Sequence, residues 1–299
     1  MKLRLILLFA GLLLAVSGQT NKPPEFSFPR WGPSLKGGSV YNFPADLDGG
    51  GSFAVSRYFV EAGMARMWDF DRMVAVSAGY GQDDYHFDGL GVRPWDNIDN
   101  YRLGLFVRWA LDDKWAFFAG PSVRSYSEAG TNLDDALAGT FFGGVSYAFG
   151  DRLTLGPAFL AAGQIEESTR YFPVLLVNWN ITEKLSLETG GGFAATAGPG
   201  LTLVYDHSRH WKFAVTGRYE EKRFRLNGDG MAPDGVGEDR NIPIVGNIGY
   251  FFYPGGYVSV IFGYNFDGKL KVYDEYGKNI YIRGYNSSLL LGVAASFRF

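Results

Sequence analysis

Cysteine is absent from the 299-residue chain, which excludes disulfides, thiolate nucleophiles and cysteine metal sites. Histidine is scarce, with three residues in the whole sequence. The charges almost cancel, at a net −3, so nothing favours nucleic acid as a partner. After residue 18, no apolar stretch approaches the ~20 residues that a membrane-spanning helix needs. Such a chain is either soluble or crosses a membrane as strands.

The beginning of the sequence has the layout of a cleaved signal peptide. Lys2 and Arg4 precede a short apolar core, and the small residues Ala15, Ser17 and Gly18 follow it. We expect cleavage near residue 19 and export from the cytoplasm, and the lack of cysteine excludes a lipoprotein anchor. The expected organisation is a signal peptide at 1–18, a Pro-rich leader at 19–35 and one domain at 36–299.

The rest of the chain is rich in the residues of strands and turns, with 17% aromatics and 41 glycines. Apolar residues alternate with polar or small ones in run after run, which is the period of a β-strand with two different faces. In the run 101–111, one face carries Tyr101, Leu103, Leu105, Val107, Trp109 and Leu111.

The connections between these runs come in two kinds. Six short polar turns alternate with longer connections, so one side of the object has tight turns and the other has large loops. This asymmetry is typical of a transmembrane β-barrel. The turns lie at 68–71, 112–114, 150–152, 182–184, 206–210 and 253–256, and the longer loops include 83–97, 227–239 and 273–288.

Aromatic residues gather beside the short turns. A ring with an apolar body and a polar edge suits the boundary between acyl chains and headgroups. The alternative, a soluble sandwich with a Trp-rich core, would place its aromatics in mid-strand. The predicted aromatic girdle consists of Trp68, Trp109, Trp115, Trp179, Trp211, Tyr253 and Tyr257.

Counting strands back from the last one through the six turns gives thirteen, and the alternating stretch Leu35–Phe43 supplies a fourteenth. The sequence therefore predicts a closed antiparallel transmembrane β-barrel of 14 strands. The weakest region is Leu185–Tyr205, which has to hold two strands and a turn. The alternative is a barrel of 12 strands.

The chain ends on "SFRF" after a run of alternating apolar residues. An edge strand in lipid would leave its backbone unpaired, so this strand should pair with the first one and close the sheet. With the signal peptide and the alternating strands, the chain resembles bacterial outer-membrane β-barrel proteins over nearly its whole mature length. The resemblance implies the outer membrane of a Gram-negative-type bacterium, contact with its lipid and lipopolysaccharide, and a signal for the barrel-assembly machinery at Phe297 and Phe299. It implies no particular activity.

Charged and polar residues in mid-strand should face the lumen, because a charge facing lipid is costly. They could line a channel that favours anions through its arginines, or form a salt-bridge network that plugs the barrel. Phe172, Val174 and Leu176 also face inward by the same alternation, which a wide water-filled porin would not need. The predicted lumen-lining residues are Arg102, Arg108, Arg124, Asn178, Glu188, Lys212, Arg218, Glu220, Asn247 and Asn265.

Sites for catalysis or metal binding are weak. His86 lies among acidic residues at the loop rim and faintly resembles an outer-membrane protease pair, but no second Asp–His pair exists. The acidic loop with Asp229, Asp234, Glu238 and Asp239 could hold Ca²⁺, although its spacing does not fit an EF-hand. We expect no enzyme, no cofactor and no metal.

The expected function is passive or facilitated passage of small solutes across the outer membrane, with apolar solutes among the candidates. The alternatives are a structural or surface-interaction barrel with a closed lumen and, third, a rim hydrolase. The sequence leaves open the solute, the state of the lumen and the oligomeric state.

Overall fold

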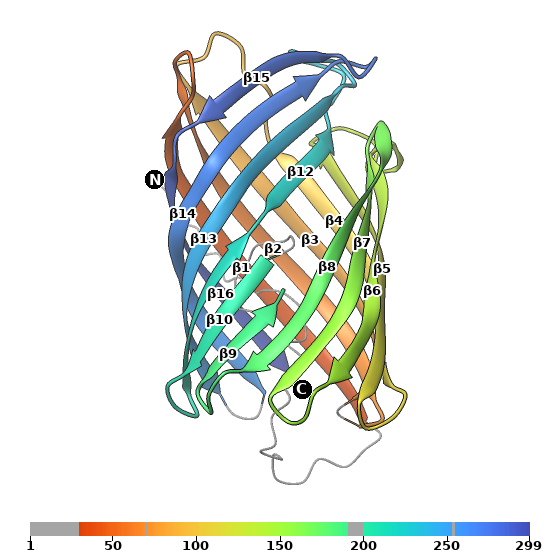
Figure 1. The fold of residues 1–299 in the computed structure, drawn as a ribbon. Helices are drawn as coiled ribbons and strands as arrows, with labels where there is room; N and C mark the ends of the chain where they lie inside the picture. The colour runs from red at the N-terminus through yellow and green to blue at the C-terminus, as the bar shows by residue number, and fades with distance from the viewer. Residues whose placement is uncertain (1–29, 70, 191–199, 253–254) are drawn as a thin grey trace.

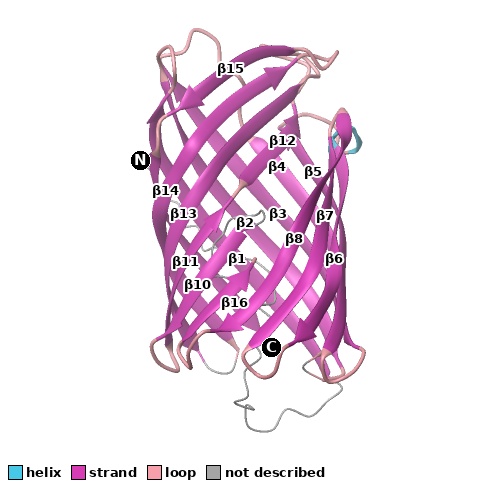
Figure 2. Cartoon of the chain, viewed as in Figure 1, coloured by secondary structure: helices cyan, strands magenta, loops and turns pink. Residues whose placement is uncertain are grey.

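The chain winds into one antiparallel sheet that closes into a barrel, with a single turn of 3₁₀ helix, η1 (Asp134–Ala136), at its rim (Figures 1 and 2). The computed structural model describes residues 30–69, 71–190, 200–252 and 255–299, so the predicted signal peptide lies outside the described residues. No helix in these ranges is both long and apolar enough to cross a membrane. The strands are β1 (Arg30–Asp46), β2 (Ser52–Met67), β3 (Arg72–Asp88), β4 (Ile98–Ala110), β5 (Trp115–Glu128), β6 (Leu137–Ala148), β7 (Leu153–Gln164), β8 (Glu167–Asn180), β9 (Leu185–Thr189), β10 (Gly200–Asp206), β11 (Trp211–Arg218), β12 (Glu220–Arg225), β13 (Val236–Phe252), β14 (Gly256–Tyr273), β15 (Asn279–Tyr285) and β16 (Ser288–Arg298).

The sheet closes because the first and last strands pair with each other. The ladder between β1 and β16 runs from Ser34 opposite Arg298 to Asn42 opposite Leu290. Each of these strands also pairs on its other side, β1 with β2 and β16 with β14. Backbone groups that would otherwise face hydrocarbon are thereby paired, as a transmembrane barrel requires.

The barrel has fourteen antiparallel crossings within the described residues, as predicted. β11 and β12 both pair with β13 and form one crossing that is interrupted at Tyr219. β15 and β16 both pair with β14 and form another. The twelve-stranded alternative is therefore not the one adopted.

Four of the predicted turns are described in full, and they lie at one end of the barrel together with the strand ends that flank the other two (Figure 2). This end is here called the short-turn end, and the opposite end is the long-loop end. Four of the turns share one device: a side-chain oxygen accepts hydrogen bonds from backbone N–H groups two or three residues later. In the tightest case Asp112 accepts from Lys114 at 2.8 Å and Trp115 at 2.7 Å, and these bonds lower the pKa of the Asp112 carboxyl. The four residues that accept are Asp69, Asp112, Thr182 and Ser208.

The outer surface carries the apolar half of each alternating run. Leu103 is 63% exposed, whereas Arg102 beside it is only partly exposed. Such an apolar surface would be unfavourable in water and is suited to lipid.

Most of the predicted girdle lies at the short-turn end, where aromatic pairs form across neighbouring strands. The ring centroids of Trp68 and Trp109 are 5.3 Å apart, and Trp211 lies 5.0 Å from Tyr250. Trp115, Trp179 and Trp211 are exposed, and Tyr257 is half-buried beside the start of β14. Tyr253 lies outside the described residues.

Two details differ from expectation, and a third, at the end of the chain, agrees with it. The first strand begins at Arg30, inside the predicted leader, and this brings Trp31 to the short-turn end, where the Arg66 guanidinium lies 5.3 Å from its ring centroid. β9 and β10 are short, with five and seven residues. The terminal Phe299 donates its N–H to the Pro33 carbonyl at 3.0 Å, so the assembly signal predicted at Phe297 and Phe299 lies against β1.

A charge on the outer face tests the lipid contact. Leu103→Arg should cost about 2–4 kcal/mol of folding free energy in lipid vesicles, because a mid-strand arginine would face hydrocarbon. Leu133→Arg is the matched control, because Leu133 is 50% exposed in the loop before η1. It should change the free energy by less than about 0.5 kcal/mol. Denaturant titration in vesicles measures both, and equal costs would argue against a lipid-facing wall.

Candidate functional site in the barrel lumen

The long-loop end is filled by a hydrophobic cluster, here called the mouth core. Trp95 lies at its centre, with its ring edge-on to Tyr85 at 5.4 Å and to Phe224 at 4.9 Å between centroids. A packed cluster of this size leaves no wide aqueous opening at this end. The mouth core consists of Ala45, Leu47, Phe53, Val55, Tyr85, Phe87, Trp95, Ile98, Tyr126, Phe224, Leu226, Ala232, Leu270, Val272 and Tyr285.

The mouth core lies where β12 is displaced from the barrel wall, so that β12 no longer pairs with the strand that precedes β11 in the sheet. β11 pairs with β10, but after Tyr219 the strand keeps only β13 as an antiparallel neighbour. Its end instead meets β5, where Arg225 lies opposite Ser127 in a parallel bridge. The ring at the long-loop end therefore closes from β12 to β5 and bypasses β6, β7 and β8.

The tip of the β7–β8 hairpin leans over the displaced strand. Its turn residue Ile165 packs against Ala136 of η1 and Val236 at the start of β13, with Tyr273 beside them. Figure 1 shows this green hairpin ending below the level that β14 and β15 reach. The hairpin tip covers the outer side of β12 and makes an overlapping joint, here called the seam, between Ile165–Arg170 and Glu221–Arg225.

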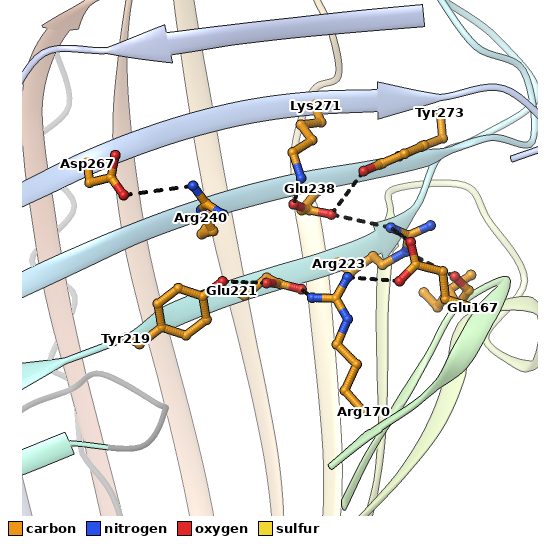
Figure 3. Close-up of polar contacts among 11 residues, drawn as sticks. Glu167, Arg170, Tyr219, Glu221, Arg223, Glu238, Arg240, Asp267, Lys271 and Tyr273 are labelled. Atoms are coloured by element: carbon orange, nitrogen blue, oxygen red, sulfur yellow. Dashed lines mark hydrogen bonds and ion pairs between the residues drawn. The ribbon is translucent and has the colours of Figure 1, made fainter. Parts of the chain in front are cut away.

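Ion pairs hold the seam where backbone pairing is missing (Figure 3). Arg223 contacts Glu167 at 3.0 Å and donates to the Ile165 carbonyl at 3.0 Å. Glu221 pairs with Arg170, and Arg225 pairs with Glu166. The cations of one side thus meet carboxylates of the other along the whole joint.

Arg223 also belongs to a row of alternating charge across three strands. Glu238 lies opposite both Arg223 and Lys271 in the sheet, at 3.3 Å and 2.5 Å. The Arg223 guanidinium lies 4.5 Å from the centroid of the Tyr273 ring, and both side chains reach Glu238 (Figure 3). Opposite charges in directly opposed positions stabilise adjacent strands, and burial makes the loss of one member costly.

A second charged layer lies inside the barrel, below the mouth core. Asp239 accepts hydrogen bonds from Arg57 at 2.8 Å, from the Tyr85 hydroxyl at 2.8 Å and from the Tyr285 hydroxyl at 2.9 Å. Lys222 contacts Asp83 at 2.6 Å. This layer joins β2, β3, β12, β13 and β15, so it ties opposite parts of the wall together.

Beneath the charged layer the lumen contains a cavity of about 480 Å³. Its volume falls within the ~300–1,000 Å³ typical of pockets that bind small organic molecules. Six cations and four carboxylates line it, together with tyrosines and an apolar wall. The apolar wall includes Phe106, Leu160, Phe172 and Val174, with Phe142 packed on Phe118 at 5.2 Å.

Half of the predicted lumen residues line this cavity: Arg102, Arg124, Arg218, Glu220 and Asn265. Asn178 and Asn247 are buried elsewhere in the barrel. Arg108 contacts Asp71 at 3.1 Å and Lys212 contacts Asp206 at 2.6 Å, both close to the short turns, and Glu188 lies on the short strand β9. That these residues form a solute path stays a prediction.

Several cavity residues were missed in the sequence. Lys36 and Glu61 form a buried ion pair of 2.6 Å between β1 and β2 and line the cavity with Arg57. The signal was available, because Arg57 and Glu61 are four residues apart in one alternating run and so share a face. The inward direction of Phe172 and Val174, by contrast, was read correctly from the alternation.

The residues considered for catalysis and metal binding are not brought together. His86 is exposed, whereas the nearby Asp83 is buried and bound to Lys222. Glu238 and Asp239 are held by cations and by tyrosine hydroxyls, away from the exposed Asp229. No group of three or more possible metal ligands occurs within the described ranges.

Comparisons with known structures find barrels of this kind. An outer membrane channel from Pseudomonas putida F1 aligns with a TM-score of 0.51 at 10% identity, over 93% of this chain and 99% of that chain. A Pseudomonas aeruginosa FadL homologue aligns with a TM-score of 0.45 at 10% identity over 89% of each chain. The P. putida toluene transporter TodX aligns with 0.44 at 11% identity over 92% of this chain and 91% of that chain.

No protein-family model and no curated protein matches the sequence. At these identities the likeness to the P. putida channel concerns the fold. With the closed ladder and the apolar outer face, it supports the plain conclusion that this is an outer-membrane β-barrel of a Gram-negative-type bacterium.

The seam can be tested through its buried arginine. Arg223→Gln should lower the free energy of unfolding by on the order of 3 kcal/mol, because the side chain is 2% exposed and the buried Glu238 loses one of its two cations. Arg93→Gln is the matched control, because that arginine is 67% exposed and pairs with Asp96 at 3.5 Å. Its loss should cost less than about 1 kcal/mol. Denaturant unfolding compares them, and similar costs would mean that the seam contributes little.

Proposed function

We propose that this barrel passes small, largely apolar solutes across the outer membrane by way of the lumen cavity. The observation that carries the proposal is the cavity itself, a space of about 480 Å³ whose wall combines Phe106, Phe142, Leu160, Phe172 and Val174 with a few charged groups. Pockets with this mixture of apolar surface and placed polar groups are typical of sites for organic molecules.

The mouth core argues against a general porin. A wide water-filled channel has a polar interior, and this lumen is blocked at the long-loop end by packed aromatic and aliphatic side chains. Purified protein in planar bilayers should therefore lack the large steady conductance of a general porin. The named solutes of the similar structures belong to those proteins and do not identify the solute here.

The packed mouth core favours a second function, that of a barrel with a closed lumen. If the mouth core never opens, the barrel is a structural or surface-interaction protein with a closed lumen. An uptake experiment separates the two functions, because only passage through the lumen requires that a change inside the cavity alters uptake.

The test uses neighbouring residues of β8 that face opposite ways. Val174 lines the cavity, whereas Leu175 is 62% exposed on the outer face. Val174→Trp should fill the cavity and reduce uptake of a radiolabelled apolar amide into intact cells at least fivefold, and Leu175→Trp should leave it unchanged. Cells lacking the protein give the background, and equal amounts of folded barrel are verified by heat-modified gel migration. If cells with the unaltered protein take up no more amide than cells that lack it, the closed barrel is favoured.

A further inference from the structure

Two arginines meet inside the lumen without a carboxylate between them. Arg102 of β4 and Arg124 of β5 lie directly opposite each other in the antiparallel ladder, and both line the cavity. Like charges in this position destabilise a strand pair. Their retention in mid-wall, facing a cavity, calls for a compensating negative charge.

Both side chains converge on one ring. The Arg124 guanidinium lies over Tyr126 at 5.1 Å from the ring centroid, and Arg102 is close enough to the same tyrosine to interact with it electrostatically. Tyr126 is buried in the mouth core, directly above the cavity. Tyr126 is therefore a shared neighbour of the two arginines at the upper end of the cavity, and it carries no carboxylate to neutralise them.

The carboxylates that line the cavity are engaged elsewhere. Glu61 contacts Lys36 at 2.6 Å, Asp83 contacts Lys222 at 2.6 Å, Glu220 lies 3.6 Å from Arg57, and Glu221 pairs with Arg170. Within the described residues, neither arginine of the pair forms an ion pair, although Arg102 is attracted to Glu61 at longer range.

The apolar wall begins below Arg102 on the same strand, β4. Phe106 follows Arg102 by four residues on β4, which places it about 13 Å nearer the short-turn end on the same face. Phe142, Phe172 and Val174 continue that wall on β6 and β8. The cavity thus has a cationic end and an apolar end.

We infer that this cavity is a binding site for an organic monoanion with an apolar body, whose charged head lies between Arg102 and Arg124 and whose body lies along Phe106, Phe142 and Phe172. The inference rests on the proposed function and narrows it to a class of solute. Two guanidinium groups offer paired N–H donors to a carboxylate, and such charge-assisted bonds are strong in a site largely shielded from water.

The experiment measures binding of three ligands that share one alkyl body and differ in head charge: octanoate, octanamide and octylammonium. Calorimetry on the full chain in lipid nanodiscs, corrected with empty nanodiscs, gives each affinity. The unaltered protein should bind octanoate at least tenfold more tightly than octanamide, and octylammonium most weakly.

Variants assign that preference to the pair. Arg102→Gln combined with Arg124→Gln should weaken octanoate binding about ten- to a hundredfold and leave octanamide binding within twofold. Arg108→Gln is the matched control, because it removes an inward arginine of the same strand that is already bound to Asp71, outside the cavity. It should change neither affinity.

Folding is monitored separately, and the double variant should melt no lower than the unaltered protein because it removes an opposed pair of like charges. A double lysine variant keeps both charges and should recover part of the preference. If octanoate binds no more tightly than octanamide, or if the folded double variant keeps the preference, the anion site is refuted while the proposed passage stands. If none of the three ligands binds, both proposals fail.

Discussion

The backbone of a chain in hydrocarbon has to pair all of its own N–H and C=O groups, and this constraint organises the barrel. It forces the ladder between β1 and β16, because without it two open edges would face lipid. Closure also fixes the period of two along every strand, since one face of a closed wall meets lipid and the other meets the lumen. The alternation of apolar and polar residues in the sequence follows from this division into a lipid face and a lumen face.

Where backbone pairing ends, side chains take its place. β8 pairs with β9 only from Asn178 to Asn180, and just above this the Thr189 hydroxyl accepts from the Val177 N–H at 2.9 Å and donates to the Leu175 carbonyl at 2.8 Å. Farther toward the long-loop end, the arginines and glutamates of the seam join β8 to β12. Charged groups can bear this role at the rim, whereas in contact with lipid they would be too costly.

The sequence was sufficient for the architecture because its signals are local. Alternation, the six turns and the aromatics beside them each occupy a few consecutive residues, and together they predicted fourteen strands. The displacement of β12 was not predicted, although the four consecutive charged residues from Glu220 to Arg223 interrupt the alternation at that point. The start of β1 at Arg30 was missed because prolines in 20–33 suggested a leader, although Pro33 is accommodated in the strand opposite Met64.

The lumen was only partly predictable, for a different reason. Alternation tells which way a residue points, so Arg102, Arg124 and Phe172 could be assigned to the interior. It does not tell which partners meet there. Arg57 and Asp239 are 182 positions apart, and their contact depends on the distance across the lumen between β2 and β13. Tertiary structure therefore decides whether an inward charge is neutralised by another side chain or left for a ligand. The spacing of residues in the sequence does not predict this.

The even number of crossings has a practical consequence for anyone who wishes to label the protein. Arg30 and Phe299 both lie at the short-turn end, which faces the periplasm in outer-membrane barrels, so a tag fused after Phe299 should lie on that side. The β14–β15 connection lies at the long-loop end, where Tyr276 is 85% exposed and Gly277 has a φ of +76°. An epitope inserted there would be displayed to the medium, and antibody staining of whole cells would report on the orientation of the entire barrel.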